Sequence, residues 1–292
     1  MLRLAVATEA ETYERMQDPL AERGIEVAPI QTSNRTFAVS ENGQRNFPDG
    51  DFDVGFVFPS RLAEGGVSEA LLGINWVNGR EELLRSRFKG ETLARLARAN
   101  IPVPDSITVS NPTDTQSLIA AFEQFDPPVV VKPNSTTQGI GVAKAHDLDS
   151  FLGICDYLDL VHDYRATGDR SFLIQEYIPE ARDYRAMVVD GEYAGAVQRR
   201  LPASALADGR WKHNVHRGAV AEGVSLDAEL QTLVENVATA LDIPWLGVDL
   251  LIRDDRVVVN ETNARPTIDS ATKYEDGFWD AVASLINKQL RE

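Results

Sequence analysis

Three oxygen-bearing side chains near the end of the chain have the spacing of a metal site. Asp249 lies inside the apolar run GVDLLI, and Glu261 and Asn263 follow the valines of RVVVNETN. Side chains alternate between the two faces of a strand, so Glu261 and Asn263 point the same way. A carboxylate inside an apolar strand is costly unless it is paired or metal-bound. The two runs therefore predict an antiparallel hairpin that carries oxygen ligands on one face.

The loop between these strands decides whether Asp249 faces Glu261. Directly opposed residues of an antiparallel ladder share a face, and this pairing requires an odd number of loop residues. A three-residue loop, Asp254 to Arg256, meets the requirement, whereas a two-residue Asp-Asp turn would put the acids on opposite faces. We therefore expect the longer loop, with Asp249, Glu261 and Asn263 as ligands of Mg²⁺; Mn²⁺ is the alternative ion. An edge hairpin with polar ends explains any one of these residues, but not all of them together.

A lysine in the middle of the chain has an unusual apolar setting. Lys132 follows a run of valines and precedes a proline, and the loop after it holds the small residues TTQGIG. A lone lysine on a strand is usually a surface group, and a glycine-rich hairpin is usually only a turn. Lys132 instead needs an anionic partner, and main-chain N–H groups of the loop could close over phosphates. The loop has neither the Gly-Lys-Ser/Thr of a Walker motif nor the third glycine of a dinucleotide fingerprint.

Two later stretches suit a nucleotide. The run QEYI at 175–178 ends an apolar strand whose main chain could read an adenine ring, with Glu176 beside it for an exocyclic amine or a ribose hydroxyl. Asp183 and Arg185 add an acid and a guanidinium on one strand face. In the run WKHNVHRG at 211–218, lysine, asparagine and arginine suit an anion. The histidines of this run have no cysteine or carboxylate ligand set nearby, so zinc is a poor interpretation.

Hydrophobic patterns predict α/β and α+β lobes that position these residues. The first lobe, 1–104, has the order of a βαβ unit and is expected to hold a parallel sheet. The second, 105–182, holds the lysine hairpin, and the third, 183–292, holds the acidic hairpin. The expected strands are 2–7, 25–30, 54–58, 107–109, 129–133, 142–144, 172–178, 185–189 and 193–200, with a hairpin over 246–261, and the expected helices are 11–23, 81–99, 113–125, 148–158, 226–241 and 277–290.

Charge and composition narrow the class of protein. Asp and Glu total 45 against 29 for Lys and Arg, a net charge of -16, and such a surface repels nucleic-acid backbones. An acidic, lysine-poor composition is typical of salt-adapted proteins, in which salt screens the self-repulsion; an ordinary acidic protein is the alternative. No apolar run approaches the roughly 20 residues that span a bilayer. The single cysteine excludes an intramolecular disulfide, and we expect a cytoplasmic protein without nucleic-acid or membrane partners.

Taken together, these stretches resemble the ATP-grasp superfamily, and most closely its RimK-like amino-acid ligases. The resemblance covers 81–292 in order, and its most particular parts are TQGIGV at 137–142, NVHRG at 214–218, GVD at 247–249 and NETN at 260–263. It implies an ATP-grasp fold preceded by an N-terminal α/β domain. It also implies ATP and Mg²⁺ as the groups that the chain binds.

The resemblance assigns roles to individual residues. Asn214 and Arg217 would approach the transferred phosphate and the acyl phosphate, with Arg185 as their partner. Asp249, Glu261 and Asn263 would carry one or two metal ions. The residues expected to bind the nucleotide are Lys89, Lys132, Gln138, Gly139, Glu176, Tyr177, Ile178, Asp183 and Lys212.

The implied activity is an ATP-dependent carboxylate–amine ligase that forms an amide through an acyl phosphate and adds an amino acid such as glutamate. Its partners would be small-molecule or peptide carboxylates and amines. A nucleotide-binding regulatory relative without ligase activity and an ATP-grasp kinase are the alternatives. The family usually continues with a small-residue run after its last metal ligand, whereas this chain has Ala264-Arg265-Pro266-Thr267, so the acceptor stays open. The run PSR at 59–61 is a candidate for the acceptor pocket, and homo-oligomerisation also stays open.

Overall fold

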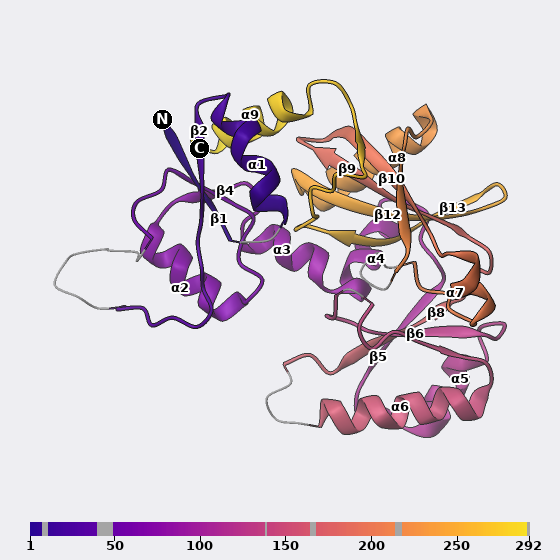
Figure 1. The fold of residues 1–292 in the computed structure, drawn as a ribbon. Helices are drawn as coiled ribbons and strands as arrows, with labels where there is room; N and C mark the ends of the chain where they lie inside the picture. Colours follow the sequence, from indigo (N-terminus) through magenta and orange to yellow (C-terminus); the bar gives the residue numbers. More distant parts are fainter. Residues whose placement is uncertain (8–10, 40–48, 138, 164–167, 214–217, 291–292) are drawn as a thin grey trace.

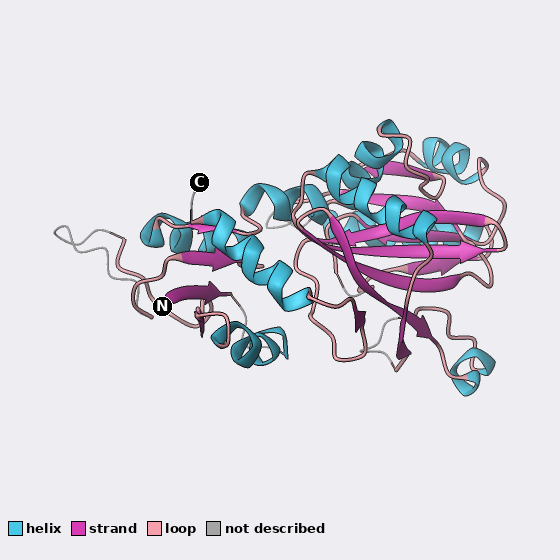
Figure 2. Ribbon diagram, turned by 90° about the horizontal axis from the view of Figure 1, so that it is seen from above, coloured by secondary structure: helices cyan, strands magenta, loops and turns pink. Residues whose placement is uncertain are grey.

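Three β-sheets follow one another along the chain, each built from a separate stretch of sequence. The computed structural model describes residues 1–7, 11–39, 49–137, 139–163, 168–213 and 218–290. Figure 1 shows the first sheet on one side, and the second and third sheets one above the other on the opposite side. Seen from above, the first lobe stands beside the other two (Figure 2). Among the described residues, none of the helices combines the length and the apolar character needed to cross a bilayer.

The N-terminal lobe has a parallel sheet in the order β2-β1-β3-β4, which confirms the predicted α/β lobe. Helix α1 buries Thr12, Met16 and Leu20, which recur every four residues and so share one face of the helix. The elements are β1 (Leu2–Val6), α1 (Glu11–Ala21), β2 (Ile25–Pro29), β3 (Val54–Phe56), α2 (Leu62–Leu72) and β4 (Asn75–Trp76).

The predicted single helix over 81–99 is wrong, because the chain forms two helices there. Phe88 has an extended backbone (φ -92°, ψ 105°) between α3 (Arg80–Arg87) and α4 (Lys89–Arg98). Both pieces are amphipathic, so hydrophobic periodicity does not reveal the break. The break puts Lys89 in the first turn of α4, where its main-chain N–H donates to the Asn134 carbonyl at 3.1 Å. This contact ties α4 to the loop that follows the lysine strand.

The central lobe has an antiparallel sheet in the order β5-β8-β6-β7, with both helices on its outer side (Figure 1). Val129 and Val131 of β6 belong to the core beneath these helices, whereas Val130 and Lys132 face the opposite side. The predicted hairpin between β6 and β7 is confirmed. The elements are β5 (Ser106–Ser110), α5 (Thr115–Phe122), β6 (Val129–Pro133), β7 (Ala143–Ala145), α6 (Leu148–His162) and β8 (Ser171–Glu176).

The C-terminal lobe has an antiparallel sheet in the order β11-β10-β9-β12-β13, with β14 paired to β10. Residues of α8 and of the sheet share one hydrophobic core. The elements are β9 (Arg182–Val189), β10 (Glu192–Arg200), α7 (Ala203–Ala207), β11 (Val220–Val224), α8 (Ala228–Leu241), β12 (Trp245–Arg253), β13 (Arg256–Asn263), β14 (Lys273–Tyr274) and α9 (Phe278–Gln289).

The last helix packs back onto the N-terminal lobe. Figure 1 shows α9 beside α1, and its Phe278 and Ile286 share a core with Leu4 and Val6 of β1. Trp245, at the start of β12, belongs to the same core. The first and third lobes are thus joined by apolar packing, and the division at 104 and 182 stays a prediction.

Candidate active site

A cleft of about 800 Å³ separates the sheet of the central lobe from the sheet of the C-terminal lobe. Lys132 enters it from β6, and Asp249 and Glu261 enter it from β12 and β13. The lysine hairpin and the acidic hairpin, which belong to different lobes, therefore face each other across this cleft. Each hairpin forms one wall of the same cleft.

The acidic hairpin pairs Asp249 with Glu261 as predicted, but by a different route. Arg253 pairs with Arg256, so the turn has two residues, and the predicted three-residue loop is wrong. A register shift next to Asp249 compensates, because β13 holds one extra residue, Asn260, at that point. A β-bulge of this kind changes the facing of the residues beyond it. The bulge therefore brings the two acids to one face, which the shorter turn alone would not do.

The same bulge brings Asn260 to Lys132. The Lys132 ammonium donates to Asn260 Oδ1 at 2.9 Å and to Gln175 Oε1. Lys132 is 8% exposed, and this burial lowers its pKa to about 8, although the charge of Glu261 acts in the opposite direction. The lysine therefore lies in a largely dry position between two amides, and no carboxylate of the described residues lies within 4 Å of its ammonium. Such a position favours an anionic ligand.

Asp249 is held by two arginines. Arg185 donates from Nε and Nη2 to the two carboxylate oxygens at 2.7 and 2.8 Å, and Arg199 Nη2 lies 2.9 Å from Oδ2. Arg199 also donates from Nε to Asp183 at 2.6 Å. Burial alone would raise the pKa of Asp249, but the two guanidinium groups outweigh it and hold that pKa well below its usual range. Asp249 is thus ionised, as a metal ligand must be.

Glu261 and Asn263 differ in their surroundings. Lys89 Nζ lies 3.5 Å from Glu261 Oε1 and also donates to the Thr136 carbonyl. Asn263 Oδ1 accepts from the main-chain N–H of Arg265 at 2.8 Å, and Asn263 is not among the residues that line the cleft. Two opposed carboxylates with an amide nearby are oxygen donors that fit Mg²⁺. The donor set therefore fits the predicted ion, with the amide further from the cleft than its spacing suggested.

An aromatic cluster forms the other end of the cleft. The rings of Tyr177 and Trp211 meet edge to face, with their centroids 5.8 Å apart. Lys144 Nζ lies 4.4 Å from the centre of the Tyr177 ring and 5.3 Å from that of Trp211. Lys212 donates to the Val142 carbonyl of the glycine-containing loop. Trp211 comes from the C-terminal lobe and Tyr177 from the strand exit of the central lobe, so the two lobes meet here.

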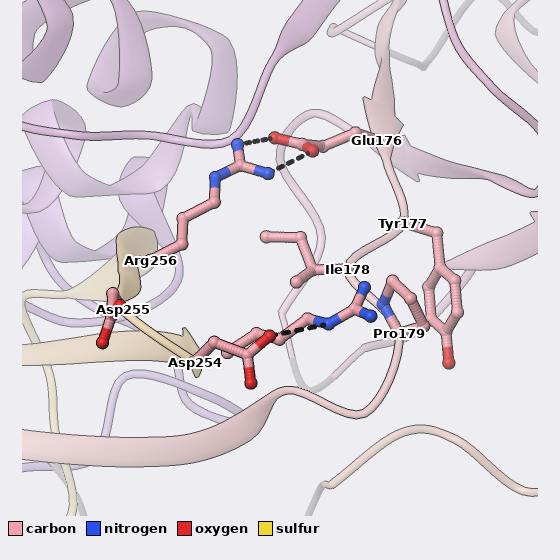
Figure 3. A pocket seen from close by; sticks show the side chains of 8 residues that line it. Glu176, Tyr177, Ile178, Pro179, Asp254, Asp255 and Arg256 are labelled. Atoms are coloured by element: carbon pink, nitrogen blue, oxygen red, sulfur yellow. Dashed lines mark hydrogen bonds and ion pairs between the residues drawn. The ribbon is translucent and has the colours of Figure 1, made fainter.

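The carboxylate of Glu176 forms an ion pair at the edge of the main cleft. Arg256 donates to it from Nη1 at 2.8 Å and from Nη2, and the Asp105 N–H donates to it at 2.8 Å. Figure 3 shows this pair on one side of Ile178 and Asp254 on the other side, and Asp254 forms an ion pair with Arg253. The residues in this view line a smaller pocket of about 380 Å³. Glu176 also lines the main cleft, and its carboxylate links the central lobe to the tip of the acidic hairpin.

The structure brings most of the predicted site residues to one cleft. Arg185 is not among the residues that line the cleft, but it is bonded to Asp249, which is. Gln138, Asn214 and Arg217 lie outside the described residues. The predicted residues that line the cleft are Lys89, Lys132, Gly139, Glu176, Tyr177, Ile178, Asp183, Lys212, Asp249 and Glu261.

Several lining residues were not predicted. Arg199 is buried, but it stands between Gln198 and Arg200 at the polar end of β10, so no apolar setting in the sequence marks it. Trp211 directly precedes the predicted Lys212. Asn260 had no signal either, because regular alternation places it on the face opposite to Glu261.

Comparisons with known proteins agree with this geometry. The RimK-like ATP-grasp domain family matches residues 86–286. A protein named "Probable alpha-L-glutamate ligase" from Enterobacter sp. (strain 638) is 32% identical over 212 residues, which are 70% of this chain and 64% of that protein. The match thus spans less than two thirds of that relative's length.

Two solved structures share the fold over nearly the whole chain. A RimK-domain ATP-grasp protein from Sphaerobacter thermophilus is 22% identical with a TM-score of 0.66, and it covers 99% of this chain and 100% of that chain. The D-alanine–D-alanine ligase of Bacillus anthracis is 17% identical with a TM-score of 0.69, over 100% of this chain and 98% of that one. The family match extends from α3 to α9 and so includes both walls of the cleft. The chain therefore belongs to the RimK-like ATP-grasp family.

Proposed function

We propose that the protein is an ATP- and Mg²⁺-dependent carboxylate–amine ligase. A substrate carboxylate oxygen attacks the γ-phosphorus of ATP, the bond to the bridging oxygen breaks, and ADP leaves. An amine then attacks the acyl carbon of the acyl phosphate, loses a proton, and releases inorganic phosphate as the amide forms. Such chemistry needs positioning and charge neutralisation rather than a protein nucleophile.

The observation that carries this proposal is the contact between the two hairpins. Lys132 Nζ donates to Asn260 Oδ1 at 2.9 Å, next to the opposed Asp249 and Glu261. A buried cation beside an acid pair is an arrangement that suits a triphosphate with a divalent ion. Lys89, which lies 3.5 Å from Glu261, would add a second phosphate contact.

The remaining nucleotide contacts are proposed by position. Tyr177, Ile178 and Trp211 would surround the adenine, and Asp183 and Lys212 would lie towards the ribose and phosphates. Glu176 would support this end through Arg256 rather than bind the base with its carboxylate. The loop residues Gln138 and Gly139 would close over the phosphates.

Asp249, Glu261 and Asn263 would hold the metal. When bound, Mg²⁺ would neutralise the charge that gathers on the phosphate oxygens. Arg185 is bonded to Asp249 and would orient it, and Asn214 and Arg217 would contact the transferred phosphoryl group. The name of the Enterobacter relative supports an amino acid such as L-glutamate as a substrate. We also propose a cytoplasmic setting with high salt, on the basis of the net charge of -16.

A screen of ADP release tests the proposal. The full chain would be incubated with ATP, MgCl₂ and molar KCl, with pairs of small carboxylates and amino acids. A ligase releases ADP only when an acceptor is present and yields a new amide that mass spectrometry detects. ATP binding without acceptor-dependent ADP release would indicate a regulatory relative, and ADP release with a stable phosphorylated product would indicate a kinase. Either of those results would refute the proposed function.

A further inference from the structure

Arg265 lies where the acidic hairpin leads back to the N-terminal lobe. Its guanidinium donates from Nη1 to the carbonyl of Phe58 and from Nη2 to the carbonyl of Ala7 at 3.1 Å. Ala7 directly follows β1, and Phe58 comes two residues after β3. The arginine therefore spans the carboxyl ends of two neighbouring parallel strands.

These strand ends form the ligand-binding edge of the N-terminal sheet. β1 is the first strand along the chain, yet it lies inside the sheet, with β2 on one side and β3 on the other. The next strand along the chain, β2, is added on one side of β1, and the strands after it, β3 and β4, are added on the other side. The gap between β1 and β3 is therefore a topological switch point. Ligands of parallel α/β sheets bind outside the carboxyl ends of the strands at such points.

The charge of Arg265 is uncompensated by the described part of the chain. No described carboxylate lies within 4 Å of its guanidinium, whereas Arg185 and Arg199 in the nearby cleft both bind Asp249. A guanidinium is a cation at neutral pH. A guanidinium has five N–H donors, and the two carbonyls use two of them. The remaining donors form a fork that matches a carboxylate.

The backbone beside this arginine is strained. Val57, between β3 and Phe58, has a φ of 55°, a left-handed conformation that β-branched residues rarely adopt. Phe58 itself is fully buried and its carbonyl is held by Arg265. Strain of this kind is concentrated at active sites and ligand sites. The strain is therefore a second sign, independent of charge, that this edge is built for binding.

We propose that Arg265 anchors a second, non-reacting carboxylate of the acid substrate, so that the acceptor is a dicarboxylate. This inference rests on the proposed ligase function. The acid substrate is the one whose reacting oxygen must reach the transferred phosphoryl group beside Glu261 and Lys89. Arg265 lies two residues beyond Asn263, and its main-chain N–H donates to that side chain at 2.8 Å. The acid substrate would therefore lie between the acidic hairpin and the ends of β1 and β3, with one carboxylate at each side.

Hydroxylamine trapping tests the anchor without knowledge of the amine. Hydroxylamine converts an acyl phosphate to a hydroxamate, which is measured by colour with ferric ion. The probes are succinate, glutarate, adipate, L-aspartate and L-glutamate, and each is compared with a monoamide in which one carboxylate is blocked. Arg265→Gln should raise the KM for the best diacid by about 10- to 100-fold, because two charge-assisted hydrogen bonds are lost. The KM for ATP should change by less than about twofold, since Arg265 does not line the nucleotide cleft.

The blocked acids provide the decisive comparison. The KM of wild type for the monoamides should be as high as the KM of Arg265→Gln for the diacids. Arg265→Gln should not raise the KM for the monoamides further. Equal loss with diacid and monoamide would overturn the inference, as would a wild type that prefers monoacids. If no acid gives hydroxamate with wild type, the ligase proposal fails as well, so the two failures are distinguishable.

A thermal-shift assay measures binding of the diacid without turnover. Each variant is compared with itself in the presence and absence of the diacid, so a lower stability of the variant does not affect the result. A diacid added with a non-hydrolysable ATP analogue should raise the Tm of wild type but not of Arg265→Gln, with Arg265→Lys in between. No diacid shift in wild type would overturn the inference. Arg15→Gln is the matched control, because Arg15 donates to the Ile268 carbonyl at 2.5 Å but has Glu11 as its carboxylate partner at 3.1 Å. Arg15→Gln should lower the stability of the protein, but it should leave the KM for the diacid and the diacid-induced rise in Tm unchanged.

Discussion

Replacement of Lys132 by methionine should stabilise the nucleotide-free protein and abolish ATP binding. The ammonium is 8% exposed, and burial lowers its pKa from an ordinary 10.5 to about 8. That difference corresponds to about 3 kcal/mol of unfavourable burial at neutral pH. The hydrogen bonds to Gln175 and Asn260 offset roughly 1 kcal/mol each. The net gain in unfolding free energy from Lys132→Met is therefore about 1 to 2 kcal/mol, or about 2 to 3 °C in Tm for a chain of 292 residues.

The pH dependence of this gain provides the sharper test. Below pH 8 the lysine is charged in both the folded and the unfolded chain, so wild type bears the full cost of burial. Between pH 8 and 10.5 the unfolded chain binds more protons than the folded chain, and the stability of wild type therefore rises with pH. The advantage of Lys132→Met should shrink across this window, whereas Lys273→Met, at an exposed lysine, should show no such change.

Differential scanning fluorimetry from pH 7 to 10.5 and calorimetric titration with ATP measure the two effects. A lower Tm for Lys132→Met at every pH would refute the argument from burial. Undiminished ATP affinity in this variant would refute the place of Lys132 in the nucleotide site.

Three further predictions concern the cleft and the surface. Arg199→Met should cost about 3 to 5 kcal/mol in urea unfolding, because it leaves buried Asp183 without its partner, and a cost below 1 kcal/mol would contradict the ion-pair network. ATP should quench the fluorescence of wild type but not of Trp211→Phe, which should bind ATP about 5- to 10-fold more weakly, with Trp279→Phe as the control. The Tm should rise by several degrees between 0.1 and 2 M KCl, because salt screens a net charge of -16, and a flat salt dependence would contradict salt adaptation.

The sequence predicted the contents of the cleft better than its detailed geometry. Alternating polarity identified Asp249 and Glu261 as a pair, and an apolar setting identified Lys132, because both patterns reflect strand geometry and the cost of buried charge. The bulge at Asn260 was not predictable, since an extra residue in a strand leaves no mark on periodicity. The correct pairing was therefore predicted with the wrong turn.

Long-range contacts account for the other differences. The position of Glu176 after an apolar strand predicted a carboxylate that binds adenine. In the structure this carboxylate binds Arg256, which lies at the tip of a hairpin distant in sequence. The break at Phe88 depends on the loop carbonyl of Asn134, which receives the main-chain N–H of Lys89. The carbonyls that Arg265 contacts belong to the opposite end of the chain. Local patterns carry no information about such partners, so only the fold reveals them.

The transfer of oxygen from acid to phosphate tests the ligase mechanism most directly. An acceptor that supports ADP release would be labelled with ¹⁸O in its carboxylate, and the released phosphate would be examined by ³¹P NMR or mass spectrometry. Attack of the carboxylate on the γ-phosphorus followed by displacement from the acyl carbon predicts phosphate that carries one ¹⁸O atom. Phosphate without the label would mean that water, and not the acid, receives the phosphoryl group, and that result would contradict the proposed acyl phosphate.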